Sequence, residues 1–260
     1  MDEDLSICIV AYRNYEEIIQ AIDTLERFTS ATIKKTIYIV DNSNEQGDAL
    51  TQFLDRIREH KDVVFIDAMS NLGFGRGHNY IIDRINSKYH CIMNPDILFC
   101  EDAFTPIISY MDTHLDVGMV IPNIVDETGN RQMVYRKEPT VFDMFIRMFC
   151  KDLFPNRVAD HTLQYENYNE PFQVPFGQGS FLVIRTDLFK QMKGFDDAFF
   201  MYMEDADLCK RVNMESSLMY LPDATVIHKW KKGSHKNLNL FKIHVASMKH
   251  YFDKWGWKWK

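Results

Sequence analysis

The chain of 260 residues is 46% hydrophobic and 26% charged, the composition and length of a globular protein with one large α/β domain or two small ones. A net charge of −7 argues against nucleic acid as a partner. No run of eighteen apolar residues is present, so we expect no transmembrane helix, and the acidic start 1–4 argues against a secretory signal. The five cysteines are scattered without a CxxC pair, so we expect reduced thiols in the cytoplasm and no disulfide frame or zinc site.

The first hundred residues alternate strand and helix patterns. Continuous apolar runs and apolar residues at helical spacing predict strands at 7–11, 36–40, 63–66 and 90–93, and helices at 15–28, 47–59 and 78–87. This rhythm predicts an open, mostly parallel sheet with helices on both faces. Ligands of such sheets bind beyond the carboxyl ends of the strands.

The second half of the chain is more mixed. The pattern predicts a hairpin of 117–125 with 131–135, a helix over 140–154, a loop over 155–172 and a strand at 181–184. The helix at 140–154 is apolar nearly all round, which is typical either of core or of an apolar contact surface.

Polar and glycine residues follow the predicted strands at the ligand-binding edge. Asp41 ends the second strand, where a carboxylate either accepts hydrogen bonds from a base or ribose or forms an Asx turn. The segment 71–79 carries Gly73, Gly75 and Gly77, and this spacing is not that of a dinucleotide fingerprint. The glycines either let the backbone approach a ligand at a helix N-terminus or only make the loop flexible.

Two further groups of residues have chemistry that suits a diphosphate substrate. Asp96 follows a strand and Asn94-Pro95, where a carboxylate can hold Mg²⁺ or Mn²⁺, and His228 ends another apolar run as a candidate ligand. The acidic run Glu204-Asp205-Ala206-Asp207 opens an amphipathic helix. One of these carboxylates is a candidate general base, and the alternative is that all of them cap the first helical turn.

The end of the chain differs in charge from the rest. Residues 229–260 carry nine lysines against one acid, a net charge of +8, which leaves −15 for the remainder. All four tryptophans lie in this tail. Lysine with tryptophan predicts a membrane-interface anchor, and a docked C-terminal helix is an equally good interpretation.

These segments, in this order, resemble the family 2 glycosyltransferases of the GT-A fold, especially the rhamnosyltransferase-like branch. The resemblance covers residues 5–235. It is carried by 6–14, 40–43, 71–79, 94–96, 177–181, 194–196, 199–208 and His228.

The resemblance implies an α/β GT-A fold with a Rossmann-like, mostly parallel sheet, a nucleotide-sugar half at 1–97, an acceptor half at 98–228 and the tail at 229–260. It implies inverting transfer of a sugar from a nucleotide diphosphate donor, with dTDP-rhamnose first and a UDP-hexose next. The acceptor is expected to be a saccharide or a polyprenyl-linked saccharide of bacterial cell-surface polysaccharide synthesis, used at the inner face of the membrane. The alternatives are a catalytically silent nucleotide- or glycan-binding module and a nucleotidyltransferase, which the sequence Tyr12-Arg13-Asn14-Tyr15 after the first strand disfavours.

The resemblance also assigns roles to single residues. Asp205 looks like the catalytic base, and Asp96 and His228 look like the residues that hold Mn²⁺ or Mg²⁺. The donor side is expected to comprise Ala11, Tyr12, Asn14, Asp41, Asn71, Gly73, Gly75, Asn79, Asn94, Gly179 and Ser180. The acceptor side is expected to involve Arg136, Glu204 and Trp230. The chain departs from the family where Asn94 replaces a first acid, which removes a carboxylate, and where lysine-rich sequence follows His228.

Overall fold

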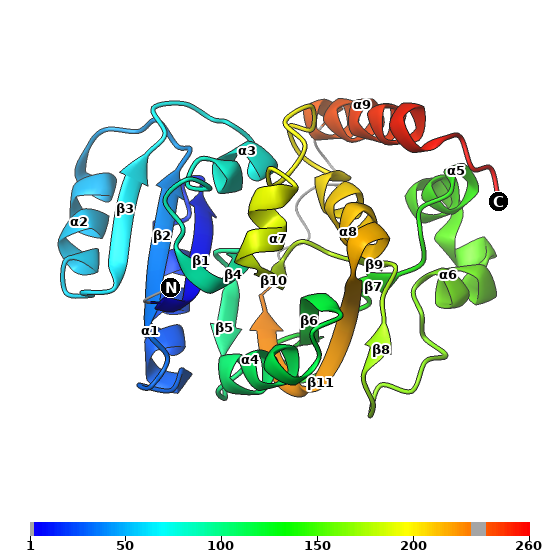
Figure 1. The fold of residues 1–260 in the computed structure, drawn as a ribbon. Helices are drawn as coiled ribbons and strands as arrows, with labels where there is room; N and C mark the ends of the chain where they lie inside the picture. The colour runs from blue at the N-terminus through cyan, green and yellow to red at the C-terminus, as the bar shows by residue number, and fades with distance from the viewer. Residues whose placement is uncertain (1–2, 230–237) are drawn as a thin grey trace.

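The computed structural model describes residues 3–229 and 238–260, and it confirms the α/β class (Figure 1). Its strands are β1 (Glu3–Ala11), β2 (Lys35–Asp41), β3 (Val63–Asp67), β4 (Ser87–Met93), β5 (Ile97–Phe99), β6 (Val117–Val125), β7 (Tyr135–Arg136), β8 (Phe172–Gln173), β9 (Phe176–Gly177), β10 (Phe181–Arg185) and β11 (Ser217–His228). Its α-helices are α1 (Tyr15–Phe28), α2 (Asp48–Ile57), α3 (Phe74–Asn79), α4 (Phe104–Thr113), α5 (Val141–Phe145), α6 (Pro155–His161), α7 (Thr186–Gln191), α8 (Glu204–Glu215) and α9 (Leu238–Trp255).

The main sheet joins both halves of the chain. Its order is β3-β2-β1-β4-β10-β6-β11-β5, with β8 also paired to β11. Strands β3, β2, β1 and β4 run parallel, as the alternating pattern predicts. Strand β10 lies between β4 and β6 and is antiparallel to both, so the second half of the chain is built directly onto the parallel half.

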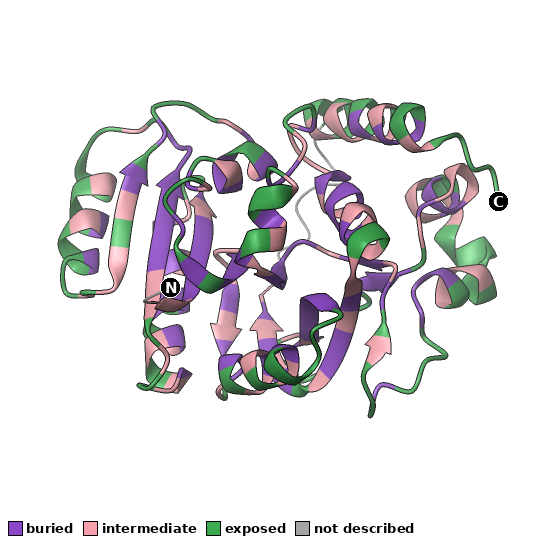
Figure 2. Cartoon of the chain, in the orientation of Figure 1, coloured by how far each residue is buried: buried purple, intermediate pink, exposed green. Residues whose placement is uncertain are grey.

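The core lies on both faces of this sheet. In β1 the consecutive residues Leu5 to Ile9 are fully buried, which is why the strand is apolar without alternation. Figure 2 shows the central strands buried and the outward faces of the helices exposed. The packed core on both faces of the sheet therefore fixes the carboxyl ends of β1, β2 and β4.

The glycine segment folds differently from the prediction of a helix at 78–87. Helix α3 begins at Phe74, within the segment, because Gly73 has φ +82° and serves as its N-cap. A Cβ atom on Gly75 would lie 2.9 Å from Phe195 Cβ, and one on Gly77 would lie 2.8 Å from both Val10 methyl carbons. These two glycines permit close packing of α3 against protein.

The predicted hairpin is reduced to its turn. The Asp126 N–H donates to the Asn130 carbonyl at 2.8 Å, but the following residues make one bridge to β6, between Val125 and Arg131. Two backbone groups of β6 are hydrogen-bonded by the Tyr135 hydroxyl and not by a second strand. The hydroxyl accepts from the Ile124 N–H at 2.8 Å and donates to the Pro122 carbonyl at 2.6 Å. Strand β7 pairs with β9 instead.

The structure also differs from the prediction for residues 140–172. The expected helix over 140–154 consists of α5, a π-helix (Ile146–Cys150) and a 3₁₀ turn (Lys151–Leu153), and the expected loop contains α6. Met144 and Ile146 are buried, whereas Phe145 and Phe149 are more than half exposed. The segment is therefore core on one side and an apolar surface on the other.

Helix α9 docks on the body of the protein, above α8 in the view of Figure 1. The Ser247 hydroxyl donates to the Met201 carbonyl at 2.8 Å. The Trp255 indole N–H and the Lys254 ammonium reach the same Asp207 carboxylate oxygen at 2.9 and 2.6 Å. Within the described ranges, no helix is both long enough and apolar enough to cross a membrane.

We expect Gly73→Ala to destabilise the fold more than Gly129→Ala. The two glycines have nearly the same φ, +82° and +83°, so both variants lose the left-handed freedom of glycine, about 1–2 kcal/mol. At Gly73 the new Cβ would also lie 2.1 Å from the Phe200 carbonyl oxygen, whereas nothing lies within 4 Å at Gly129. The free energy of unfolding from urea denaturation should fall by at least about 1 kcal/mol more for Gly73→Ala. Equal losses would contradict this account.

Candidate active site

The connection between β9 and β10, Gln178-Gly179-Ser180, holds three parts of the site. Its first residue accepts a hydrogen bond from Arg136 Nη2 at 3.3 Å through Oε1. Its second donates its backbone N–H to Asp205 Oδ2 at 3.1 Å. The carbonyl of its third accepts from the Asn94 N–H at 2.8 Å. This short connection, whose last two residues form a turn, thus contacts an arginine, a carboxylate and the Asn94 turn in that order.

A cavity of about 590 Å³ opens beside this connection. The residues predicted from sequence that line it are Asn94, Arg136, Gly179, Ser180, Glu204 and Asp205. The rest of the lining is mainly apolar and comes from the 144–149 region, the 201–203 turn and α9. Donor-side and acceptor-side residues therefore meet in one space.

Asp205 lies in the first turn of α8 after a strained turn. Tyr202 and Met203 both have left-handed φ values, +71° and +67°, and each costs about 1–3 kcal/mol. Asp205 Oδ1 accepts from the Ala206 N–H at 2.9 Å. Burial raises the pKa of Asp205, and the Gly179 N–H and Arg136 oppose the shift. A carboxylate with a raised pKa is a stronger base at neutral pH than an exposed aspartate.

Glu204 is the neighbouring acid and is only 6% exposed. Burial and the Asp205 charge raise the pKa of Glu204 well above its usual range. Ionisation is therefore disfavoured for both acids, and in Glu204 the negative charge of Asp205 adds to the effect of burial.

Two arginines face these acids. Arg136, on β7, is 8% exposed and lies over the Phe176 ring, with 5.4 Å between guanidinium carbon and ring centroid. Burial lowers the pKa of Arg136 to about 9, so it stays charged at neutral pH. Arg147 comes from the π-helix, and burial lowers its pKa against the attraction of Asp205. Arg147 was not among the residues predicted from the sequence. A cation within a predicted helix that is apolar nearly all round is the signal that could have identified it.

Asp96 and His228 lie together at the end of the sheet, with 3.4 Å between Asp96 Oδ1 and His228 Nε2. Gln132 fixes the imidazole, because its Nε2 donates to the His228 carbonyl at 2.7 Å and its Oε1 lies 2.9 Å from Nδ1. The amide oxygen can only accept, so Nδ1 carries a proton, and Nε2 is the ring nitrogen that faces Asp96.

A carboxylate and an imidazole nitrogen that face each other are a donor set for a cation. The described residues hold no group of three His, Cys, Asp or Glu side chains that could bind a metal. Mg²⁺ or Mn²⁺ would therefore need ligands from substrate phosphates and water as well, which is the usual manner for Mg²⁺. The residues present fit that kind of site.

The residues expected at the nucleotide lie at the carboxyl ends of β1 and β2, outside the lining of the cavity. Ala11 and Asp41 are register partners, and Tyr12 is 49% exposed. The Asp41 carboxylate accepts from the Ser43 N–H and from the Tyr15 hydroxyl, each at 2.8 Å. The Asx turn considered for Asp41 is thus present, and both carboxylate oxygens of this buried residue accept hydrogen bonds within the protein.

The other expected donor-side residues make contacts within the protein. Asn14 Oδ1 accepts from the Tyr12 N–H at 2.9 Å, and Asn71 Oδ1 accepts from the Gly73 N–H at 3.0 Å. The Asn79 amide joins α3 to the 195–197 turn at 2.8 to 2.9 Å, which gives it a structural role. Trp230, expected at the acceptor, lies outside the described residues.

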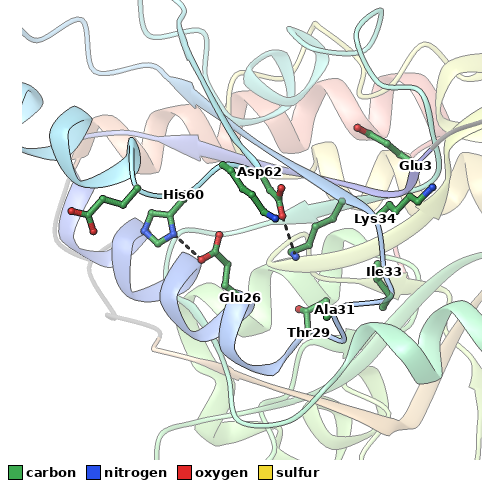
Figure 3. Close-up of a pocket in the computed structure, with 11 residues that line it drawn as sticks. Glu3, Glu26, Thr29, Ala31, Ile33, Lys34, His60 and Asp62 are labelled. Carbon is green, nitrogen blue, oxygen red and sulfur yellow. Dashed lines mark hydrogen bonds and ion pairs between the residues drawn. The ribbon is translucent and has the colours of Figure 1, made fainter.

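A second cavity, of about 730 Å³, lies at the opposite ends of β1, β2 and β3 (Figure 3). Two pairs lie among its lining residues, His60 with Glu26 at 2.8 Å and Lys35 with Asp62 at 3.5 Å. Ligands of open sheets bind at the carboxyl ends of parallel strands, so this cavity is not the donor site.

Comparison with known proteins decides the family. A family model described as glycosyl transferase family 2 matches residues 6–193. The chain belongs to glycosyl transferase family 2. The match covers β1 to α7, including the whole parallel half of the sheet.

Two curated relatives place this family 2 glycosyltransferase near rhamnosyltransferases. It is 25% identical over 223 residues to the N-acetylglucosaminyl-diphospho-decaprenol L-rhamnosyltransferase of Mycobacterium tuberculosis, covering 78% of this chain and 71% of the relative. It is 24% identical over 224 residues to the rhamnosyltransferase WbbL of Escherichia coli K12, covering 74% and 83%. The resemblance to the rhamnosyltransferase-like branch is confirmed.

Solved structures confirm the GT-A fold. GalNAc-T7 with UDP, GalNAc and Mn²⁺ has a TM-score of 0.73 at 13% identity over 96% of this chain, which spans 48% of that chain. The mannosyltransferase PcManGT from Pyrobaculum calidifontis with GDP-Man and Mn²⁺ has a TM-score of 0.63 at 14% identity, covering 90% of this chain and 59% of that chain. The glycosyltransferase described here thus spans about half to three fifths of these structures.

The raised pKa of Glu204 gives this glycosyltransferase a pH-dependent stability that Glu204→Gln should remove. In the unfolded chain Glu204 ionises above about pH 4.3, whereas in the folded protein it ionises only at higher pH. The wild type should therefore lose about 1.4 kcal/mol of unfolding free energy per pH unit, relative to Glu204→Gln, as the pH rises from about 4.3 toward the folded pKa. Denaturation of both proteins between pH 4.5 and 7 measures this. A difference that does not change with pH would contradict burial of a protonated Glu204.

Proposed function

We propose that this enzyme transfers a sugar, with inversion, from a nucleotide diphosphate donor to a hydroxyl of a saccharide or polyprenyl-linked saccharide. Rhamnose from dTDP-rhamnose is the first candidate, because both rhamnosyltransferase relatives align over most of the chain, and a UDP-hexose is the second. The observation that carries the proposal is a partly buried carboxylate, Asp205, held by a backbone N–H in a cavity that the Asn94 turn also lines.

Asp205 supplies the base in this reaction. Its carboxylate takes the proton of the acceptor hydroxyl as that oxygen forms a bond to the anomeric carbon of the donor. The bond from the anomeric carbon to the diphosphate breaks on the opposite face, and its electron pair leaves with the nucleoside diphosphate. Burial places the pKa of Asp205 closer to neutrality, which favours this proton transfer.

The donor is proposed to lie along the carboxyl ends of the first strands, in the half formed by 1–97. Asp41 would contact the nucleobase, with Ala11, Tyr12 and Asn14 around it. The turn at Asn94 and the residues Gly179 and Ser180 would border the sugar and lead to the half formed by 98–228.

Asp96 and His228 would hold Mn²⁺ or Mg²⁺ at the donor diphosphate. A divalent cation there supplies Lewis acidity that offsets the negative charge of the leaving group. Asn94 contributes no charge where the family pattern has an acid, so two side chains carry this role. The Mn²⁺ in the two neighbouring structures supports the assignment.

The enzyme is proposed to work in the cytoplasm, peripherally on the inner face of the membrane, in cell-surface polysaccharide synthesis. Support comes from the excess of lysine in 229–260 and from the exposed indoles of Trp257 and Trp259. Helix α9 itself is a docked helix, so its exposed side and the end of the tail would make the contact.

Asp205→Asn should abolish transfer while donor binding persists. The amide is nearly isosteric but does not take up a proton, so kcat for NDP-sugar turnover should fall by about 10²–10⁴. Turnover of dTDP-rhamnose and UDP-hexoses with Mn²⁺ is measured by release of nucleoside diphosphate, and donor binding by calorimetry.

Asp160→Asn is the matched control, because Asp160 is exposed on α6 and pairs only with Lys137 among the described residues. It should keep wild-type turnover. A wild type that neither binds nor turns over any NDP-sugar would contradict the enzyme proposal, and binding without turnover would favour the silent module. Full activity of Asp205→Asn would remove its role as base.

Asp96→Asn should weaken Mn²⁺ binding, so that donor binding needs a higher Mn²⁺ concentration. One of the two proposed protein ligands loses its charge, so the Mn²⁺ concentration for half-maximal binding of dTDP or UDP should rise about tenfold or more. The measurement is calorimetric titration of the nucleotide into metal-free protein with added Mn²⁺. An unchanged Mn²⁺ requirement would place the metal elsewhere.

A further inference from the structure

Two arginines in the active-site cavity have no carboxylate of their own. Within the described residues neither Arg136 nor Arg147 forms an ion pair within 4 Å, and Arg136 Nε has no hydrogen-bond partner. The undescribed residues contain a single acid, Asp2. Asp205 is the carboxylate that raises the pKa of both arginines. A guanidinium that is removed from water without a carboxylate partner is costly, so such an arrangement favours an anionic ligand.

The surrounding charges do not balance the arginines. Asp143 also attracts Arg147, but Arg157 binds its carboxylate through two nitrogens at 2.6 and 3.1 Å, and the Thr140 hydroxyl donates to it at 2.6 Å. Arg136, Arg147 and Arg157 thus face the carboxylates of Asp143 and Asp205, while burial and the Asp205 charge disfavour ionisation of Glu204. The excess positive charge grows by one more when Asp205 accepts a proton from the acceptor.

The arginines are separated from the proposed metal side. Along the connection 178–180, Arg136 contacts the first residue, Asp205 the second, and Asn94, which leads to Asp96, the third. The base therefore stands between the arginine contact and the turn that serves the donor diphosphate. An anion at the arginines is thus a second anion, on the acceptor side.

An apolar path continues from the arginines to the surface. The lining that the 144–149 segment and α9 contribute beside Arg147 comprises Met144, Met148, Phe149, Leu240 and Phe241, with His244 as its polar member. At its rim the Phe149 ring is 62% exposed and Phe241 43% exposed, and their centroids lie 6.5 Å apart. A ligand that fits this path carries an anionic group directly followed by an apolar chain.

We propose that Arg136 and Arg147 bind the phosphate or diphosphate group of a lipid-linked acceptor, whose chain leaves the cavity past Phe149 and Phe241. This places the acceptor saccharide at Asp205 and makes the arginine pair the determinant of acceptor class. The inference rests on the proposed function for the role of Asp205. Guanidinium groups suit phosphate because their N–H donors match its oxygens two at a time.

The test is calorimetric binding of farnesyl diphosphate to the full chain with saturating dTDP and Mn²⁺, so that the donor side is already filled. Arg147→Gln should raise the Kd about ten- to a hundredfold, the loss of a charge-assisted contact. Lys151→Gln, which removes the same charge from the exposed neighbouring turn, should bind as the wild type. Farnesol should bind more weakly than farnesyl diphosphate and show no dependence on residue 147.

Several results would overturn the proposal. They are equal binding of farnesyl diphosphate by wild type and Arg147→Gln, equal affinity of the wild type for farnesol, or loss of dTDP affinity in Arg147→Gln. The last would assign the arginine to the donor. Arg147→Lys keeps the charge and tests the same point if the glutamine variant does not fold, with an intermediate Kd expected. NDP-sugar turnover by the same wild-type preparation separates failure of this inference from failure of the glycosyltransferase assignment.

Discussion

The site depends on holding one partly buried carboxylate at the wall of the cavity. Asp205 is stabilised by the N–H groups of Gly179 and Ala206, and its charge is balanced by arginine across the cavity. The Gly179 backbone approaches so closely that a Cβ atom there would lie 3.1 Å from Asp205 Cβ. Because the same three-residue connection also holds Arg136 and the Asn94 turn, a shift of β9 or β10 would move all three at once. The mixed sheet is the rigid element that prevents such a shift.

The turn before Asp205 stores strain that other elements must hold. Two successive non-glycine residues with left-handed φ angles would relax if the turn were free. Helix α9 prevents this through the hydrogen bond of Ser247 to Met201, and the Phe74 N–H binds the Phe200 carbonyl at 3.0 Å from the other side. The start of α3 and the C-terminal helix thus fix the geometry of the base from opposite ends of the sequence.

Sequence patterns predict the parallel half well because each strand there is buried on both faces and each helix has a regular apolar stripe. Asp96 with His228, and Asp205 with Asn94, Gly179 and Ser180, were found because their order along the chain resembles a known family. The start of α3 could not be predicted, because Gly73 acts as a cap only when it packs on Phe200, far away in sequence. The prediction of a hairpin was wrong for a similar reason, since the Tyr135 hydroxyl makes the hydrogen bonds to β6 that a second strand would make. The place of Arg147 in the cavity could not be predicted, because the spacing of apolar residues does not reveal which cavity a helix faces.

The docking of α9 has a consequence for how the enzyme can be shortened. Asp207 is fully buried, and its carboxylate is shared by Arg211 from its own helix and by Lys254 and Trp255 from α9. Removing the last residues would leave that charge half compensated beneath the helix that begins at the catalytic turn. Helix α9 is therefore part of the folded body, and proteolytic trimming that removed it would also unsettle the turn before Asp205.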